Sequence, residues 1–331
     1  MPGRSSHSQT APLRRPWAAV GLLVFCLAAG CSREQPAPLR MGSTVWPGFE
    51  AFYVARERGY WRDDQVRLVE YASTSELIRA FRNGTIDAGL LTLDEAFLVA
   101  QDVPDIRVIL VTDVSDGADV IMAAPQYASM KALKGRRVGT ETTALGAYVL
   151  FRALQLSGLT RDDVTIVPLE FSEHEAAFRR GSVDAVVTYE PVRTRLRSAG
   201  ARQVFDSSEI PGEIVDVMAV RGAYVLANPD ATRAVLQGFH RAQRYFQEQP
   251  GDALRIAATR ENVTPDEFRQ SMSLLRVPDA AEVKVMLTGR PSSLQAGAKS
   301  LAALMVAQNL LSKPVDVDSL FDEGTLRRLY P

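Results

Sequence analysis

Phe81-Arg82-Asn83-Gly84-Thr85-Ile86-Asp87-Ala88 returns 97 residues later as Phe178-Arg179-Arg180-Gly181-Ser182-Val183-Asp184-Ala185. In each copy a helix is expected to end at the glycine, which adopts the left-handed conformation at little steric cost. A short apolar run then follows as a buried strand. The similarity extends back to Gly59-Tyr60 and to Gly158-Leu159. This repeat predicts two similar α/β lobes with a ligand cleft between them.

The first 31 residues have the pattern of an export signal. Arg4, Arg14 and Arg15 precede the apolar run 17–29, which is too short for a typical membrane span. The run ends in Leu27-Ala28-Ala29-Gly30-Cys31, which resembles a bacterial lipobox, so we expect Cys31 to be lipidated and to become the N-terminus. An ordinary cleaved signal and a twin-arginine signal are the alternatives. Residues 32–39 are expected to form a flexible tether.

Composition excludes several classes of protein. The chain has two cysteines, and processing at Cys31 would remove one and consume the other, so cysteine metal sites and a cysteine nucleophile are not expected. Removing three arginines leaves 35 basic against 39 acidic residues, a net charge of −4. This balance gives no reason to expect nucleic acid as a partner.

Short apolar strands alternate with helices as far as Phe205, which predicts an α/β fold with mostly parallel sheets. We expect extended segments at 120–125 and 214–220 to cross between the lobes and form a hinge. Lobe I would then comprise residues 40–123 and 219–331, and lobe II residues 124–218. Helices between 230 and 329 would complete lobe I.

Several stretches, taken in their order and spacing, resemble a known family. They are Trp46-Pro47-Gly48-Phe49, Glu57 to Trp61, Phe81 to Ala88, Leu133 to Gly139, Val183 to Pro191 and Asn228-Pro229. The chain resembles solute-binding proteins of ABC importers, in the group that binds nitrate, taurine, sulfonates and thiamine-pyrimidine precursors. The resemblance implies a two-lobed type II periplasmic binding fold without catalysis, metal or cofactor. It also implies a monomer that is anchored by lipid and delivers a small ligand to permease and ATPase subunits.

Ligands of parallel α/β lobes bind beyond the carboxyl ends of the strands. The candidate ligand-binding residues selected on this basis are Trp46, Gly48, Phe49, Thr74, Ser75, Thr92, Asp113, Gly117, Thr140, Thr143, Tyr189, Glu190 and Asp216. Trp46 is the strongest of these candidates. The threonines and serines also suit helix N-caps, and Glu190 suits a first helical turn. The loop 113–119 could instead be a plain turn, and it lacks the glutamate that a calcium loop needs at its twelfth position.

The expected loops carry many acidic residues and a single nearby base, Arg193. We therefore expect a polar nitrogenous ligand, pyrimidine-like or an amine, that stacks on Trp46 or Tyr189. The first alternative is an oxyanion such as a sulfonate or nitrate, held by helix N-termini. The second is a sensor lipoprotein that serves a signalling receptor. A pyrimidine-synthase-like enzyme is the least favoured, because neither His174 nor His240 follows a predicted strand.

Overall fold

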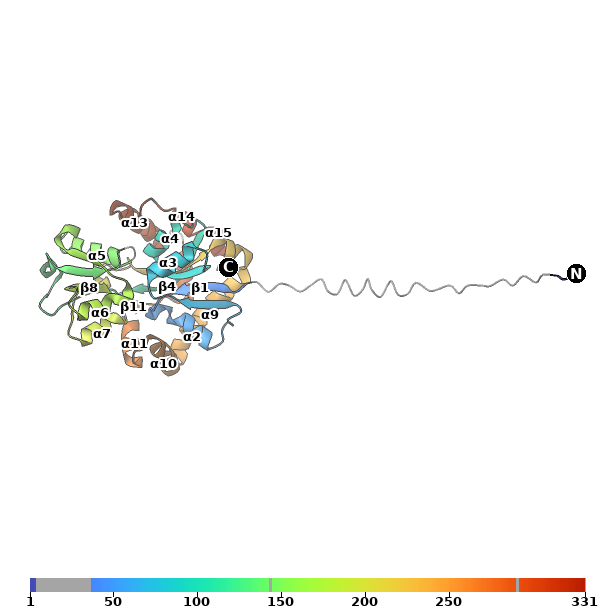
Figure 1. Ribbon diagram of the computed structural model, residues 1–331, viewed down its shortest axis with the longest axis horizontal. Coiled ribbons are helices and arrows are strands. Elements are labelled where there is room, and N and C mark those ends of the chain that lie inside the picture. Colours follow the sequence, from blue (N-terminus) through green and yellow to red (C-terminus); the bar gives the residue numbers. More distant parts are fainter. Residues whose placement is uncertain (4–36, 143–144, 290–291, 331) are drawn as a thin grey trace. The chain divides into compact units, whose positions relative to one another are not determined.

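The computed structural model describes residues 1–3, 37–142, 145–289 and 292–330, and the part from Ala37 onward forms one compact unit. It contains two sheets with helices on their faces (Figure 1). The larger sheet has the order β11-β4-β10-β3-β1-β2, and the smaller one β7-β6-β8-β5-β9. The larger sheet consists of β1 (Leu39–Ser43), β2 (Val66–Glu70), β3 (Ala88–Thr92), β4 (Ile106–Ser115), β10 (Val215–Arg221) and β11 (Leu275–Arg276). The smaller sheet consists of β5 (Val120–Ala123), β6 (Arg137–Thr140), β7 (Thr165–Pro168), β8 (Ala185–Thr188) and β9 (Arg202–Asp206).

The helices divide between the two sheets. Those that follow strands of the larger sheet are α2 (Glu50–Glu57), α3 (Thr74–Arg82), α4 (Leu93–Ala100) and α8 (Gly222–Ala227). Those of the smaller sheet are α5 (Leu145–Leu156), α6 (His174–Arg179) and α7 (Val192–Ser198), which lie on the left in Figure 1. The C-terminal helices are α9 (Pro229–Glu248), α10 (Pro250–Glu261), α11 (Pro265–Met272), α12 (Ala280–Thr288), α13 (Ser293–Ala307), α14 (Val317–Leu320) and α15 (Glu323–Leu329). They pack against α2, α4 and β4.

The repeated motif has the same structure in both copies. Gly84 and Gly181 both have positive φ, 71° and 68°, immediately after a helix. Asp87 accepts hydrogen bonds from the backbone N–H and the guanidinium of Arg40. Asp184 accepts the same set from Arg137. Each aspartate thus fixes the start of one strand to its parallel neighbour, which is a structural role.

Two segments connect the sheets, and they are hydrogen-bonded to each other. The hydroxyls of Ser115 and Ser207 lie 2.8 Å apart, and Ser207 also accepts the N–H of Gly117 at 2.7 Å. Gly117 has a φ of +110°, which an L side chain rarely adopts, so glycine is required at this bend. The two connections therefore form a paired crossing.

The sheets to which β5 and β10 belong differ from the lobes to which the sequence assigned these residues. Residues 120–123, assigned to lobe I by the sequence, form β5 in the smaller sheet, whereas residues 215–218, assigned to lobe II, belong to β10 in the larger one. We therefore propose that the first boundary lies between β4 and β5 and the second between β9 and β10.

The expected two-sheet α/β class is confirmed, with two differences of detail. Both sheets are mixed, because β5 and β10 run antiparallel to their neighbours. Asp113 lies inside β4 instead of in a loop, since the pairing with β10 continues through Val114. Most residues of β3, β4, β5 and β10 are buried, as expected for strands covered on both faces.

Candidate functional site

A cavity of about 30 Å³ lies where loops of the two sheets meet. It is lined by Thr44, Trp46, Phe49, Thr74, Thr92, Glu95, Asp119, Leu145, Tyr189 and Asp216. Six of these residues belong to the predicted set. They come from strand ends and helix starts, which is where the α/β topology places ligands. Leu145 and Tyr189 come from the side of the smaller sheet, so both sheets contribute.

Trp46 and Tyr189 form an aromatic wall across the two sheets. Their rings are 5.7 Å apart and nearly perpendicular, at 76°. Tyr189 also stacks on Phe171, with ring centroids 4.1 Å apart and an interplanar angle of 3°. Edge-to-face and stacked contacts of this kind stabilise a fixed arrangement of rings. The wall is therefore rigid on the side of the smaller sheet.

Trp46 is held in place from behind. Its indole Nε1–H donates to both carboxylate oxygens of Asp113, at 3.2 and 3.3 Å. Gly48 makes this possible, because a Cβ at that position would stand 1.8 Å from Asp113 Oδ2. Gly48 and Asp113 are thus part of the support of the cavity and do not line it.

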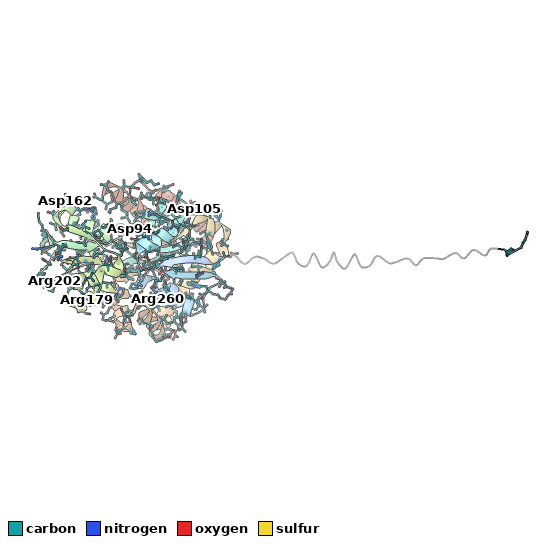
Figure 2. The ribbon with its side chains drawn as sticks, viewed as in Figure 1. Asp94, Asp105, Asp162, Arg179, Arg202 and Arg260 are labelled. Atoms are coloured by element: carbon teal, nitrogen blue, oxygen red, sulfur yellow. The ribbon has the colours of Figure 1, made fainter. Side chains whose placement is uncertain are left out.

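Buried carboxyl groups surround the cavity. They belong to Asp94 and Glu95 on α4, Asp113 on β4, Asp119 before β5, Glu141 after β6 and Asp216 on β10. Each is at most 5% exposed. Figure 2 labels Asp94 near the middle of the view and Asp105 and Asp162 nearer the outline. Four carboxyl oxygens have no hydrogen-bond partner among the described residues, namely Asp94 Oδ2, Asp119 Oδ2, Glu141 Oε1 and Asp216 Oδ2.

Burial disfavours the ionised form of these acids and raises their pKa values. It raises the pKa of Asp94 and of Asp113 to about 6, that of Asp119 to about 7 and that of Glu141 to about 8. For Glu95 and Asp216, burial and then the charge of a neighbouring aspartate raise the pKa well above its usual range. At neutral pH the empty site therefore holds several protons.

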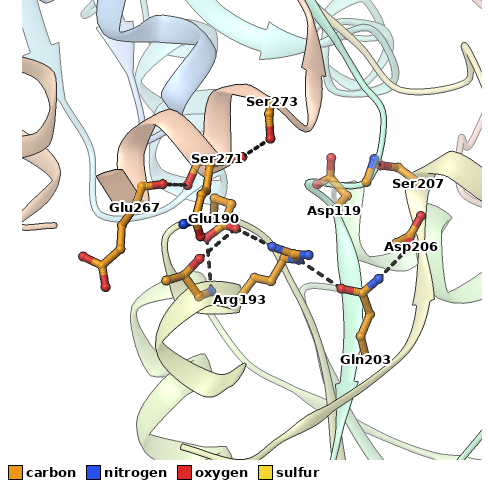
Figure 3. A network of polar contacts seen from close by, with 12 residues as sticks. Asp119, Glu190, Arg193, Gln203, Asp206, Ser207, Glu267, Ser271 and Ser273 are labelled. Carbon is orange, nitrogen blue, oxygen red and sulfur yellow. Dashed lines mark hydrogen bonds and ion pairs between the residues drawn. The ribbon is translucent and has the colours of Figure 1, made fainter. Parts of the chain in front are cut away.

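Glu190 does not line the cavity. Its Oε1 accepts from Arg193 Nη1 at 2.9 Å and from the Thr194 hydroxyl at 3.0 Å, and its Oε2 accepts the N–H of Thr194. Figure 3 shows this network continuing from Arg193 to Gln203 and Asp206. Glu190 therefore binds residues at the start of α7, which agrees with the alternative that it belongs to a first helical turn.

The other predicted residues are not among those that line the cavity. Thr140 is buried and donates its hydroxyl to the carbonyl of Glu141, while Ser75 lines a neighbouring groove of about 550 Å³. Gly117 belongs to the crossing described above. Thr143 and the lipidation candidate Cys31 lie outside the described residues.

Four residues that line the cavity were missing from the predicted set, namely Thr44, Glu95, Asp119 and Leu145. Thr44 and Glu95 could have been found by the strand-end rule, because they follow β1 and β3 closely. Asp119 belongs to the loop 113–119 that the strand-end rule selected, but the rule does not say which residues of that loop reach the cavity, since this depends on how the first crossing bends. Leu145 is an apolar residue at the start of α5, and neither property marks it as a ligand contact.

Three further observations concern the described part of the chain. No group of three or more His, Cys, Asp or Glu side chains in the described part of the chain is arranged to hold a metal ion. A search of the same residues for an apolar helix of membrane-spanning length found none. His174 and His240 are both buried, and neither lines the cavity.

Comparison with known proteins places the chain in a family. A model of the NMT1-like family matches residues 32–260. A protein of Brucella abortus (strain 2308) that is named as a binding protein is 23% identical over 321 residues, which cover 92% of this chain and 95% of that protein.

Two solved structures show the same fold. The alkanesulfonate-binding protein SsuA of Xanthomonas axonopodis pv. citri, bound to MOPS, has a TM-score of 0.73 at 20% identity and covers 86% of this chain and 98% of its own. The desulfurization enzyme DszB has a TM-score of 0.65 at 17% identity, with 89% and 99% covered. The chain belongs to the NMT1-like family and has the two-lobed fold of periplasmic binding proteins.

Proposed function

We propose that this protein is the solute-binding component of an ABC-type importer and that it captures a small polar, nitrogenous solute between its lobes. The observation that carries the proposal is the cavity itself. It is enclosed by residues of both sheets and combines an aromatic wall with three acidic side chains, Glu95, Asp119 and Asp216. A pyrimidine-like ring or an amine would offer the N–H donors that these oxygens lack.

Binding is favoured over catalysis by the residues at the cavity. The lining residues include threonine hydroxyls and three carboxyl groups but neither histidine nor cysteine, so the cavity lacks the residues of the common nucleophile–base pairs. Buried His174 hydrogen-bonds the Thr188 hydroxyl at 3.2 Å, which is a packing role. The enzyme among the structural neighbours shares the fold, and a fold alone does not transfer chemistry.

An oxyanion is the second candidate, and the alkanesulfonate binder among the neighbours favours it. The structure also offers backbone N–H groups at the N-termini of α3 and α4. α3 begins with the lining residue Thr74, and α4 begins directly after the lining residue Thr92. Such ends bind anions. A sensor lipoprotein would use the same cavity, and a signalling receptor in place of the permease would distinguish it.

A thermal-shift screen of the soluble body tests this proposal. Aminopyrimidines, amines, alkanesulfonates and nitrate would be added one by one, because a ligand that binds only the folded state raises its melting temperature. We expect a shift with nitrogenous solutes and no chemical conversion of the solute. A shift confined to sulfonates or nitrate would favour the oxyanion candidate, and product formation would refute a pure binding role.

Lipid anchoring through Cys31 and a monomeric state also remain proposals. Labelling of the full chain with a radioactive fatty acid should be lost in Cys31→Ser. Light scattering of the soluble body should give the mass of one chain.

A further inference from the structure

Two buried acceptors face the cavity without a partner. Asp119 and Asp216 line it, each is 2% exposed, and Oδ2 of each has no hydrogen-bond partner among the described residues. We propose that the cavity binds the cationic nitrogen of its ligand, an ammonium or guanidinium group, through Asp119 and Asp216 with Glu95 beside them. This inference rests on the proposed solute-binding function and narrows the ligand to a cation.

The charges around the cavity favour a cation over an anion. The titratable groups that line it are Glu95, Asp119, Tyr189 and Asp216, and the buried carboxyl groups behind them belong to Asp94, Asp113 and Glu141. None of the described residues that line the cavity is basic. Arg193, the nearest base in the sequence, is paired with Glu190. A bound anion would have to keep all these acids protonated, whereas a cation lets them ionise.

The hydrogen-bond acceptors of the cavity favour a cation over a neutral ring as the ligand. Buried acceptors without a donor cost free energy, and a ligand that donates several N–H groups removes that cost. The T-shaped pair of Trp46 and Tyr189 adds aromatic surface that attracts a cation within about 6 Å of a ring. A neutral pyrimidine would use the rings but would leave the acidic charge uncompensated.

The size of the cavity limits the group that enters it. Its volume of about 30 Å³ corresponds to about two water molecules. Methylammonium, with two non-hydrogen atoms, is near this size, whereas guanidinium, and still more a complete pyrimidine ring, would require the lobes to separate.

Three planar molecules of similar shape test the charge directly, namely guanidinium, urea and nitrate, which carry charges of +1, 0 and −1. Calorimetry of the mature soluble body should show binding of guanidinium at millimolar concentration and none of urea or nitrate. Methylammonium and methanesulfonate form a second matched pair, and methylammonium should bind.

Proton exchange gives a readout that a merely structural cluster would not produce. Because the empty site holds protons, a cation should release them, and its affinity should increase from pH 6 to pH 9. Titrations in two buffers with different ionisation enthalpies measure the number released. Binding of an oxyanion would take protons up and would strengthen toward low pH.

Asp119→Asn keeps the shape of the side chain and removes its charge. It should weaken guanidinium binding about tenfold or more, the effect expected of a lost charged hydrogen bond. Asp116→Asn is the matched control, because Asp116 lies three residues away in the same crossing and is exposed. Its affinity should stay within about twofold of the parent.

Three outcomes would overturn the inference. They are binding of nitrate or methanesulfonate with proton uptake, equal effects of the two aspartate substitutions, and failure of both cations to bind folded protein. Each leaves the proposed function standing if another solute in the thermal-shift screen binds between the lobes. If no solute of any class binds, the proposed function fails as well.

Discussion

Asp216 on β10 faces Asp113 on β4 in the antiparallel pair, and both carboxyl groups are buried. Two ionised carboxylates placed side by side repel each other, so the pair favours a proton on one of them. Burial and then the charge of Asp113 raise the pKa of Asp216 well above its usual range, whereas Asp113, which accepts from Trp46 and Thr112, has a pKa of about 6. Asp216 is therefore the carboxyl of the pair that keeps its proton to higher pH.

The stability of the empty protein should consequently fall as the pH rises. Raised pKa values mean that the folded state holds protons that the unfolded state has lost, so this stabilisation is complete below about pH 4 and is lost through pH 6 to 8. Each such proton contributes a slope of about 1.4 kcal/mol per pH unit. Denaturant unfolding at pH 5.5, 7 and 8.5 measures the slope.

Asp216→Asn provides the control for this pH dependence. The amide cannot ionise beside Asp113, so the variant should be more stable than the parent at pH 8.5 and should show a shallower slope. An increase in the parent's stability between pH 5.5 and 8.5 would contradict the assignment of protons to these carboxyls.

Trp46→Phe should destabilise the protein by about 1–3 kcal/mol, because buried Asp113 loses a donor. Trp61→Phe removes the same atoms from a buried indole whose Nε1 has no partner among the described residues. It should cost less. Equal losses in denaturant unfolding would show that the hydrogen bond contributes nothing.

Gly48→Ala should lower both stability and ligand affinity, since its Cβ would displace the Asp113 carboxylate and Trp46 Nε1. Gly297 lies in the middle of α13 with no atom within 4 Å of an added Cβ. Gly297→Ala should therefore stabilise the helix by about 0.5–1 kcal/mol. Thermal melts of the two variants should move in opposite directions, and ligand affinity should fall only in Gly48→Ala. A neutral Gly48→Ala would refute the close packing behind Trp46.

Arg193→Met should cost about 3 kcal/mol at neutral pH, because it leaves fully buried Glu190 without its ion-pair partner. Arg197→Met, on the exposed face of the same helix, should change the free energy of unfolding by less than about 0.5 kcal/mol. Ligand affinity should be unaffected in both. A selective loss of affinity in Arg193→Met with stability retained would restore Glu190 as a ligand contact.

The sequence predicted the elements better than the contacts between them. Helices such as α3 and α9 and the two glycine stops follow from local periodicity and backbone preference. The pairing of Trp46 with Asp113 joins residues 67 positions apart. No local pattern encodes such a pair, which arises only when β4 is placed beside the loop after β1.

The same limit explains which residues of the candidate site could be predicted from the sequence and which could not. The strand-end rule found six of the ten residues that line the cavity, because a parallel topology fixes where strand ends lie. It could not separate Asp216, whose Oδ2 is free, from Glu190, whose oxygens are both bonded. That difference depends on side-chain direction and on Arg193, three residues farther along the helix.

The positions of β5 and β10 determine what happens to the sheets when the chain is cut. β5 follows β1–β4 in sequence yet lies between β8 and β9, while β10 follows β6–β9 and lies between β3 and β4. Each half of the polypeptide thus donates the strand that fills the gap in the sheet of the other half. A chain severed between β5 and β6 would yield two fragments with interrupted sheets, which could become complete only by exchanging strands with each other.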